Sequence, residues 1–202
     1  MSSQDSKNSD KDTINLVKKF IASNQRKRRN LINDIESSVE SLYIVGEEII
    51  KYVDREGDDW SIGWVLQVLK KYKPNFFENN IYNNWFYTNS AIDLTYDDLQ
   101  LNLLKQDFEE ADRLTSAYLR KLAGKVAENR GYVFYSEVKD MPGEDLVTID
   151  RLWNIYSQGK FGFSNQAKLL KSVGKRYDLL WLKIGWKKDG IWTRYPSSFC
   201  WS

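Results

Sequence analysis

The residue types that most often carry out enzyme chemistry are sparse in this sequence. Its 202 residues include no histidine and one cysteine, Cys200. The absence of histidine excludes an imidazole acid–base group, a Ser–His–Asp triad and histidine ligation of zinc or haem. The lone cysteine excludes an intramolecular disulfide and is typical of a reducing compartment.

Two further patterns lack the spacing that catalysis needs. Asp145 and Asp150 are five residues apart, which separates them on a helix surface, so helix caps or solvated charges explain them better than a catalytic pair. Gly159 and Gly162 flank Phe161, but no Lys-Ser or Lys-Thr follows, as a phosphate-binding loop requires. We therefore expect no enzymatic activity.

The aromatic content is high for a chain of this length, with eight Trp, twelve Tyr and nine Phe. Aromatic side chains of this number either fill a core or form a wall against which a flat ligand packs, and composition alone favours the core. The net charge of +2 is too near neutral to indicate nucleic-acid binding. The basic cluster Arg26–Arg29 is interpreted as a solvated helix end; as a nucleic-acid site it would show steep salt dependence.

Hydrophobic spacing predicts an all-α protein, with a disordered tail over 1–12 and an N-terminal helical bundle over 13–90. Thr13 is the expected N-cap of the first helix. The other helices expected in the bundle cover Leu31–Val53, Trp60–Tyr72 and an aromatic segment over 75–90.

Residues 91–202 form the second predicted domain. Asp107 is its clearest expected N-cap, and Ser164 is expected to cap a later helix. No alternation long enough for a sheet occurs. The expected helices are Tyr96–Leu104, Phe108–Leu122, Asp145–Tyr156 and Asn165–Val173; a loop with the segment Tyr132–Val138 separates the second from the third.

Three ordered stretches of this second domain carry a family resemblance. They are D-L-V-T-I-D-R-L-W (145–153), S-Q-G-K-F-G-F-S-N-Q (157–166), and I-G-W-K (184–187) followed by W-T-R-Y (192–195). From Tyr96 to Phe199 the chain resembles the genomes-uncoupled-four family of porphyrin-binding proteins. The resemblance implies a helical core domain with a cupped groove that holds protoporphyrin IX or magnesium protoporphyrin IX, with no obligatory cofactor.

The same resemblance implies a regulatory carrier in chlorophyll biosynthesis that presents its pigment to the large, porphyrin-binding subunit of magnesium chelatase. It implies a photosynthetic setting: the chloroplast stroma, with plastid encoding, or a cyanobacterial cytoplasm as the alternative. The first 13 residues are polar and resemble neither a signal peptide nor a transit peptide. No apolar run reaches the 18 residues of a membrane span, which leaves peripheral membrane association open.

Within this resemblance, the groove is expected to combine apolar side chains with cations for the two propionates of the pigment. Trp153, Phe163 and Trp192 are assigned to the core instead. An axial contact to magnesium would come from water, a carbonyl, a hydroxyl or a carboxylate, since histidine is absent. The expected groove residues are Tyr132, Val133, Phe134, Met141, Phe161, Trp181 and Trp186, with Lys187 and Arg194 for the propionates and Lys188 and Arg176 behind them.

Two departures from the family pattern bear on this expectation. The segment between Val173 and Gly185 is shorter than in the family, which predicts a shorter loop over the pigment and weaker binding. The sequence also stops at Ser202, before the tail that follows the W-x-R-Y stretch in the family. The main alternative is a protein-interaction or signalling module of the same fold that has lost pigment binding.

Overall fold

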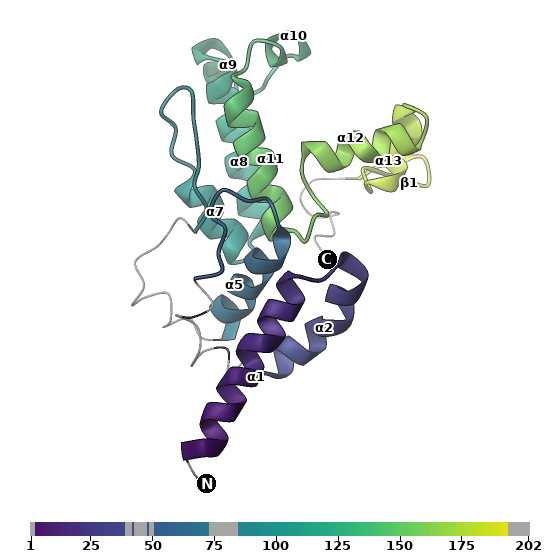
Figure 1. Ribbon diagram of the computed structural model, residues 1–202. Helices are drawn as coiled ribbons and strands as arrows, with labels where there is room; N and C mark the ends of the chain where they lie inside the picture. The colour runs from purple at the N-terminus through teal and green to yellow at the C-terminus, as the bar shows by residue number, and fades with distance from the viewer. Residues whose placement is uncertain (1–2, 39–41, 43–47, 49–50, 73–84, 194–202) are drawn as a thin grey trace.

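The computed structural model describes residues 3–38, 42, 48, 51–72 and 85–193, and its regular secondary structure in these ranges is almost entirely helical (Figure 1). The predicted all-α class is confirmed, with one short hairpin added. The elements are α1 (Ser3–Ile21), α2 (Gln25–Ser37), α5 (Trp60–Tyr72), α7 (Asp97–Leu104), α8 (Phe108–Leu122), α9 (Lys125–Arg130), α10 (Tyr135–Val138), α11 (Gly143–Tyr156), α12 (Phe163–Ser172), α13 (Tyr177–Lys183), β1 (Lys187–Lys188) and β2 (Ile191–Trp192).

Helix α5 is the centre of the hydrophobic core. Every residue from Trp60 to Leu69 is buried, and the helix packs against α11, α7 and α1. The amide nitrogen of Gln67 donates to the backbone oxygens of Leu103 (2.9 Å) and Tyr156 (2.8 Å), near the ends of α7 and α11. Tyr156 is the last residue of α11, where a helix end leaves carbonyls open, so this one buried polar side chain satisfies a helix end and joins three helices.

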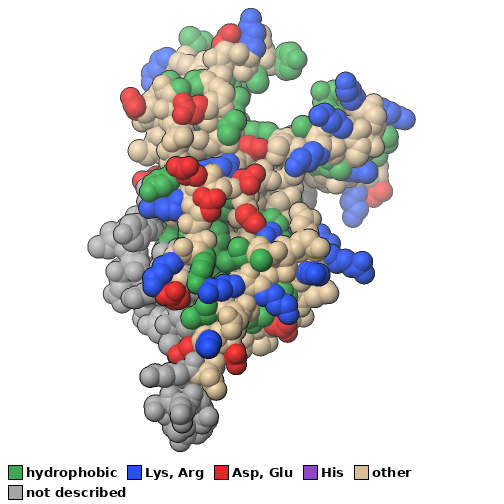
Figure 2. Space-filling model, in the orientation of Figure 1, with side chains coloured by type: hydrophobic (Ala, Val, Ile, Leu, Met, Phe, Trp, Pro, Cys, Tyr) green, Lys and Arg blue, Asp and Glu red, His purple; other side chains and the backbone are tan. Residues whose placement is uncertain are grey.

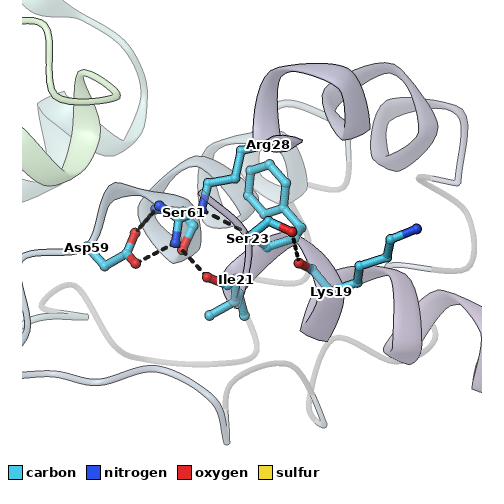
Figure 3. A network of polar contacts seen from close by, with 7 residues as sticks. Lys19, Ile21, Ser23, Arg28, Asp59 and Ser61 are labelled. Atoms are coloured by element: carbon cyan, nitrogen blue, oxygen red, sulfur yellow. Dashed lines mark hydrogen bonds and ion pairs between the residues drawn. The ribbon is translucent and has the colours of Figure 1, made fainter. Parts of the chain in front are cut away.

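Helices α1 and α2 are joined to α5 through Arg28 (Figure 3). Its guanidinium donates to the backbone oxygens of Phe20 (3.1 Å) and Ile21 (2.5 Å) and makes a two-pronged ion pair with Asp59 (2.8 and 2.6 Å). Asp59 also accepts from the backbone nitrogen of Ser61 (2.8 Å), in the first turn of α5. The interpretation of 26–29 as a solvated helix end is therefore wrong for Arg28, which is buried.

Several predicted boundaries are corrected in the N-terminal part. Helix α1 begins at Ser3, so residues 3–12 are helical where a disordered tail was expected, and Thr13 lies inside the helix rather than capping it. Helix α2 ends at Ser37, so the expected helix 31–53 is not continuous. Residues 85–90 are not helical, and the rest of the aromatic segment expected over 75–90 lies outside the described residues.

The helices from α5 onward agree better with expectation. Helices α5, α7, α8, α11 and α12 lie within two residues of their predicted bounds. Asp107 caps α8 by accepting from the backbone nitrogen of Glu110 (3.1 Å), as predicted. The predicted capping role of Ser164 is wrong, because the carboxylate of Asp150 on α11 accepts from the first turn of α12 instead (3.0 Å).

Candidate functional site

Exposed aromatic side chains gather in two places, and the first is the loop between α9 and α10. We call residues 131–134 the aromatic loop. Tyr132 is 54% exposed and Phe134 is 49% exposed, and their rings meet edge to face at 5.3 Å. The guanidinium of Arg130 lies over both rings, 4.7 Å from the centroid of Tyr132 and 4.0 Å from that of Phe134. The loop therefore presents a shaped aromatic surface backed by a cation.

Glu137 holds the aromatic loop in this shape. Its carboxylate accepts from the backbone nitrogen of Phe134 (2.7 Å) and from the guanidinium of Arg130 (2.6 Å). Arg130 also donates to the backbone oxygen of Tyr132 (2.9 Å). The bond from Phe134, followed by that from Arg130, lowers the pKa of Glu137. The carboxylate stays ionised at neutral pH, and the loop is set before any ligand arrives.

The second aromatic group belongs to α12, α13 and the hairpin, which we call the C-terminal lobe (163–193). Strands β1 and β2 are joined by Asp189 (φ 51°) and Gly190 (φ 83°), both in the left-handed region, as a type I′ turn requires. The turn brings Trp192 against Trp181, with ring centroids 4.8 Å apart. The ammonium group of Lys187 lies 5.6 Å from the ring centroid of Trp192.

A hollow separates the two groups. Figure 1 places α9 and α10 at one end of the α8–α11 pair and the C-terminal lobe to one side of it. Figure 2 shows the hollow between these parts, with hydrophobic side chains on both borders and Lys and Arg side chains over the outer side of the lobe. We call this hollow the interlobe groove. Residues 163–193 contain seven Lys and Arg against two Asp, so the lobe is strongly cationic in a chain whose net charge is only +2.

Comparison with known families decides the relationship. The model of the family described as GUN4-like matches residues 89–202 of the chain. The chain belongs to the GUN4-like family. The match includes α7 to β2, and therefore both borders of the interlobe groove.

Individual relatives agree with this assignment. A "Ycf53-like protein" of Synechocystis is 38% identical over 162 residues, which cover 78% of this chain and 70% of the relative. The "Tetrapyrrole-binding protein, chloroplastic" of Arabidopsis thaliana is 42% identical over 113 residues, 52% of this chain and 43% of that protein. The solved structure of GUN4 from Chlamydomonas reinhardtii is similar with a TM-score of 0.55 and 33% identity, over 57% of this chain and 76% of that one.

The expected groove residues of this GUN4-like chain fall into three sets. The first set belongs to the two parts on either side of the groove: Tyr132, Val133 and Phe134 lie in the aromatic loop, where Val133 is partly buried against the core cluster, and Trp181, Trp186, Lys187 and Lys188 lie in the lobe. Met141 is instead buried in the core, and Phe161 is half-buried between Phe108 (5.7 Å) and Trp153 (5.9 Å). Arg194 lies outside the described residues, and Arg176 is paired with Asp178 (2.9 Å).

Of the three aromatic residues assigned to the core, only Trp153 is there. It is buried, and its indole nitrogen donates to the hydroxyl of Thr115 (2.9 Å). The assignment was wrong for Phe163 and for Trp192, which is 53% exposed, because among the described residues the C-terminal lobe supplies no side chain to the hydrophobic core cluster.

Sequence reasoning also missed exposed apolar residues in the same two parts of the chain. Tyr135, which is 95% exposed, follows the aromatic loop directly, and Tyr177 and Ile191 belong to the lobe. The run Y-V-F-Y over 132–135 was the available signal, because four large apolar residues in a row between polar segments do not fit the single buried stripe of an amphipathic helix.

A second hollow, of about 740 Å³, lies where the segments around Glu56 and Tyr87 meet α11. Arg151 lines it and donates to the backbone oxygens of Gly57 and Tyr87. Within the described residues, no group of three His, Cys, Asp or Glu side chains could hold a metal ion. None of the described helices is long and apolar enough to cross a membrane.

Proposed function

We propose that this protein binds a porphyrin, protoporphyrin IX or magnesium protoporphyrin IX, in the interlobe groove and acts as a regulatory carrier rather than a catalyst. The observation that supports this proposal is that exposed aromatic side chains gather in the aromatic loop and in the C-terminal lobe, the two parts between which the hollow lies. Membership of the GUN4-like family and the name of the Arabidopsis relative, a tetrapyrrole-binding protein, support it.

The two borders suit the two chemistries of a porphyrin. A broad apolar macrocycle packs against Tyr132, Phe134, Trp181 and Trp186, while the cationic lobe offers partners for the propionates. Burying ~300 Å² of ring contributes about 7 kcal/mol before costs. The entropy lost on association and on ordering of side chains reduces this binding free energy by several kcal/mol. Each ion pair between a propionate and an exposed Lys or Arg adds ~1 kcal/mol. The sum is compatible with binding near the micromolar range, which corresponds to about −8 kcal/mol.

The groove places one restriction on a magnesium porphyrin. The chain has no histidine, so an axial ligand would be an oxygen atom of water, of the backbone, or of a hydroxyl or carboxylate group. Magnesium prefers such ligands, so the metal-bearing pigment remains a suitable occupant.

The biological role that we propose is delivery of the pigment to the large subunit of magnesium chelatase in chlorophyll synthesis. Relatives from a cyanobacterium, from red algae and from a chloroplast indicate the setting, a plastid or a cyanobacterial cell. An open groove suits a carrier, because a ligand that is held at the surface can pass to a partner without unfolding of the core.

The test is a titration of the protein with protoporphyrin IX, followed by quenching of tryptophan fluorescence. We expect saturable quenching near micromolar concentration. Tyr132→Ala and Trp181→Ala should each weaken binding roughly five- to tenfold, the effect of about 1–1.5 kcal/mol for one lost aromatic contact.

Tyr87→Ala is the matched control. Tyr87 is an exposed tyrosine with an arginine over its ring, as Tyr132 is, but its cation is Arg55 and it lines the second hollow. Its replacement should leave the affinity unchanged. A loss with Tyr87→Ala but not with Tyr132→Ala would move the ligand to the second hollow. Absence of quenching by the folded wild type would reject pigment binding and favour a protein-interaction module of the same fold.

A further inference from the structure

The C-terminal lobe is joined to the rest of the protein with almost no apolar packing. Among its described residues, 163–193, only Leu180 is buried, and none belongs to the core cluster. The apolar anchor ends just before the lobe, where Phe161 packs against Trp153 and Phe108. Something other than hydrophobic burial must therefore set the angle at which the lobe leaves α11.

A cluster of polar side chains sits at this junction. The amide nitrogen of Asn154 donates to the backbone oxygen of Asp150 (3.0 Å) and to the hydroxyl of Ser164 (3.1 Å). The amide nitrogen of Asn165 donates to the side-chain oxygen of Asn154 (2.6 Å) and to the backbone oxygen of Phe161 (2.9 Å). The carboxylate of Asp150 accepts from the backbone nitrogen of Ser164 (3.0 Å).

We call Asp150, Asn154, Ser164 and Asn165 the interhelix clamp. Two of its residues lie on α11 and two lie in the first turn of α12. Three of the five hydrogen bonds join the two helices, and the other two hold the amides of Asn154 and Asn165 in place, so together they fix the direction and the rotation of α12. The bonds are partly buried, which makes each of them costlier to break than a bond in open water.

The backbone between the two helices is shaped to close the clamp. Gly162 has φ of 119°, and a Cβ there would lie 2.5 Å from a carboxylate oxygen of Asp150. Only glycine lets the chain pass this close to the carboxylate. The hydroxyl of Ser157 accepts from the backbone nitrogen of Phe161 (2.8 Å), which fixes the start of the turn.

We propose that the interhelix clamp is a positioning device that sets the angle of the C-terminal lobe and thereby the width of the interlobe groove. The inference rests on the proposed porphyrin site, which it deepens. Glu137 holds the aromatic loop through bonds that do not involve the clamp. When the clamp opens, the lobe therefore changes position and the aromatic loop does not. The apparent affinity for a porphyrin then scales with the fraction of molecules whose lobe has the competent angle.

The angle can be measured without any ligand. Spin labels are placed at Ser136→Cys in α10 and at Lys171→Cys in α12, both exposed positions, in a Cys200→Ser background. Pulsed electron spin resonance then gives the distance distribution across the groove. Asn154→Ala combined with Asn165→Ala should broaden or shift this distribution, and Ser164→Ala, a milder change, should do so to a smaller extent.

Asn102→Ala is the matched control. The amide of Asn102 also donates to the backbone oxygen four residues earlier, that of Asp98 (2.8 Å), but within α7 and away from the lobe. Its replacement should leave the distance distribution and the porphyrin affinity unchanged. The thermal unfolding midpoint of each variant, measured in parallel, separates a change in lobe angle from a loss of fold.

The second measurement is the affinity of each variant for protoporphyrin IX. If opening the clamp lowers the competent fraction to between a third and a tenth, the apparent dissociation constant rises roughly three- to tenfold. An unchanged distance distribution in both clamp variants would overturn the inference, as would unchanged affinity despite a broadened distribution. If the wild type itself binds no porphyrin, the proposed function fails, whereas the distance measurement still decides whether the clamp sets the lobe.

Discussion

Gly63 of α5 lies directly against Ile155 of α11. A Cβ placed at residue 63 would stand 2.5 Å from the Cγ2 atom of Ile155 and 2.9 Å from its backbone oxygen. The two helices therefore approach as closely as their backbones permit. This contact is one of those by which the N-terminal half joins the half that carries the interlobe groove.

Gly63→Ala should lower the free energy of unfolding by about 1–3 kcal/mol, because the added methyl group forces the two helices apart. Chemical denaturation with guanidinium chloride measures this change. Gly143→Ala is the control: no atom lies within 4 Å of a Cβ at that position, so the same substitution should be neutral or slightly stabilising. Equal stability of the two variants would contradict the close approach.

Tyr96→Phe should destabilise the protein by about 1–3 kcal/mol. The hydroxyl of Tyr96 donates to the buried carboxylate of Asp145 (2.6 Å), and its loss removes a donor from a charge shielded from water. Tyr118→Phe is the matched control, since that ring packs on Tyr96 at 4.8 Å and the described residues show no hydrogen bond of its hydroxyl. The free energy of unfolding of each variant is measured by thermal and chemical denaturation. A larger loss of stability in Tyr118→Phe than in Tyr96→Phe would refute the stabilising role of the Tyr96–Asp145 hydrogen bond.

Asp145 should also make stability depend on acid pH. Burial raises the pKa of its carboxyl, but hydrogen bonds from Ser90, Tyr96 and the backbone of Ala91 outweigh this, so the net pKa lies below its ordinary value of 3.8. A carboxyl whose pKa is lower in the folded state contributes stability above about pH 4, and the contribution is lost as the pH falls through the folded pKa.

The measurement for this effect is the unfolding free energy of the wild type and of Asp145→Asn between pH 7 and pH 2. The wild type should be the more stable protein at neutral pH, and the difference should shrink as the pH falls below about 4. A difference that stays constant over this range would show that ionised Asp145 is not the cause.

The helices of the core were predictable because local patterns and tertiary packing agree there. Helix α5 lies between clear breakers, and α8 combines the apolar stripe of Phe108–Leu122 with the cap Asp107. The start of α1 was missed because its first residues are polar, and Thr13, a good capping residue type, sits inside the helix. Residue type alone does not distinguish a capping position from a position inside a helix.

Long-range contacts account for most of the remaining errors. Arg28 resembled its exposed neighbours in sequence, and only the fold brings Asp59 and the end of α1 to it. Ser164 has the residue type of a cap, but Asp150, fourteen positions earlier, makes that bond. The aromatic loop and Trp181 were proposed from the family resemblance, whereas the exposure of Trp192 follows from a lobe that lacks a core.

The hairpin of the C-terminal lobe provides a final prediction. Gly190 has φ of 83°, which a β-branched residue adopts only with strain of about 1–3 kcal/mol. Gly190→Val should open the turn, separate Trp192 from Trp181 and change the near-ultraviolet circular dichroism. It should leave the unfolding midpoint almost unchanged, because the described residues of the lobe take no part in the core cluster.

The same variant should weaken porphyrin binding several-fold if the tryptophan pair forms one border of the interlobe groove. Asp189→Asn is the conservative control, since Asn-Gly is at least as well suited as Asp-Gly to a type I′ turn and should preserve both the dichroism and the affinity. Wild-type affinity in Gly190→Val, together with an altered dichroism spectrum, would remove the Trp181–Trp192 pair from the groove and leave the aromatic loop as its principal apolar surface.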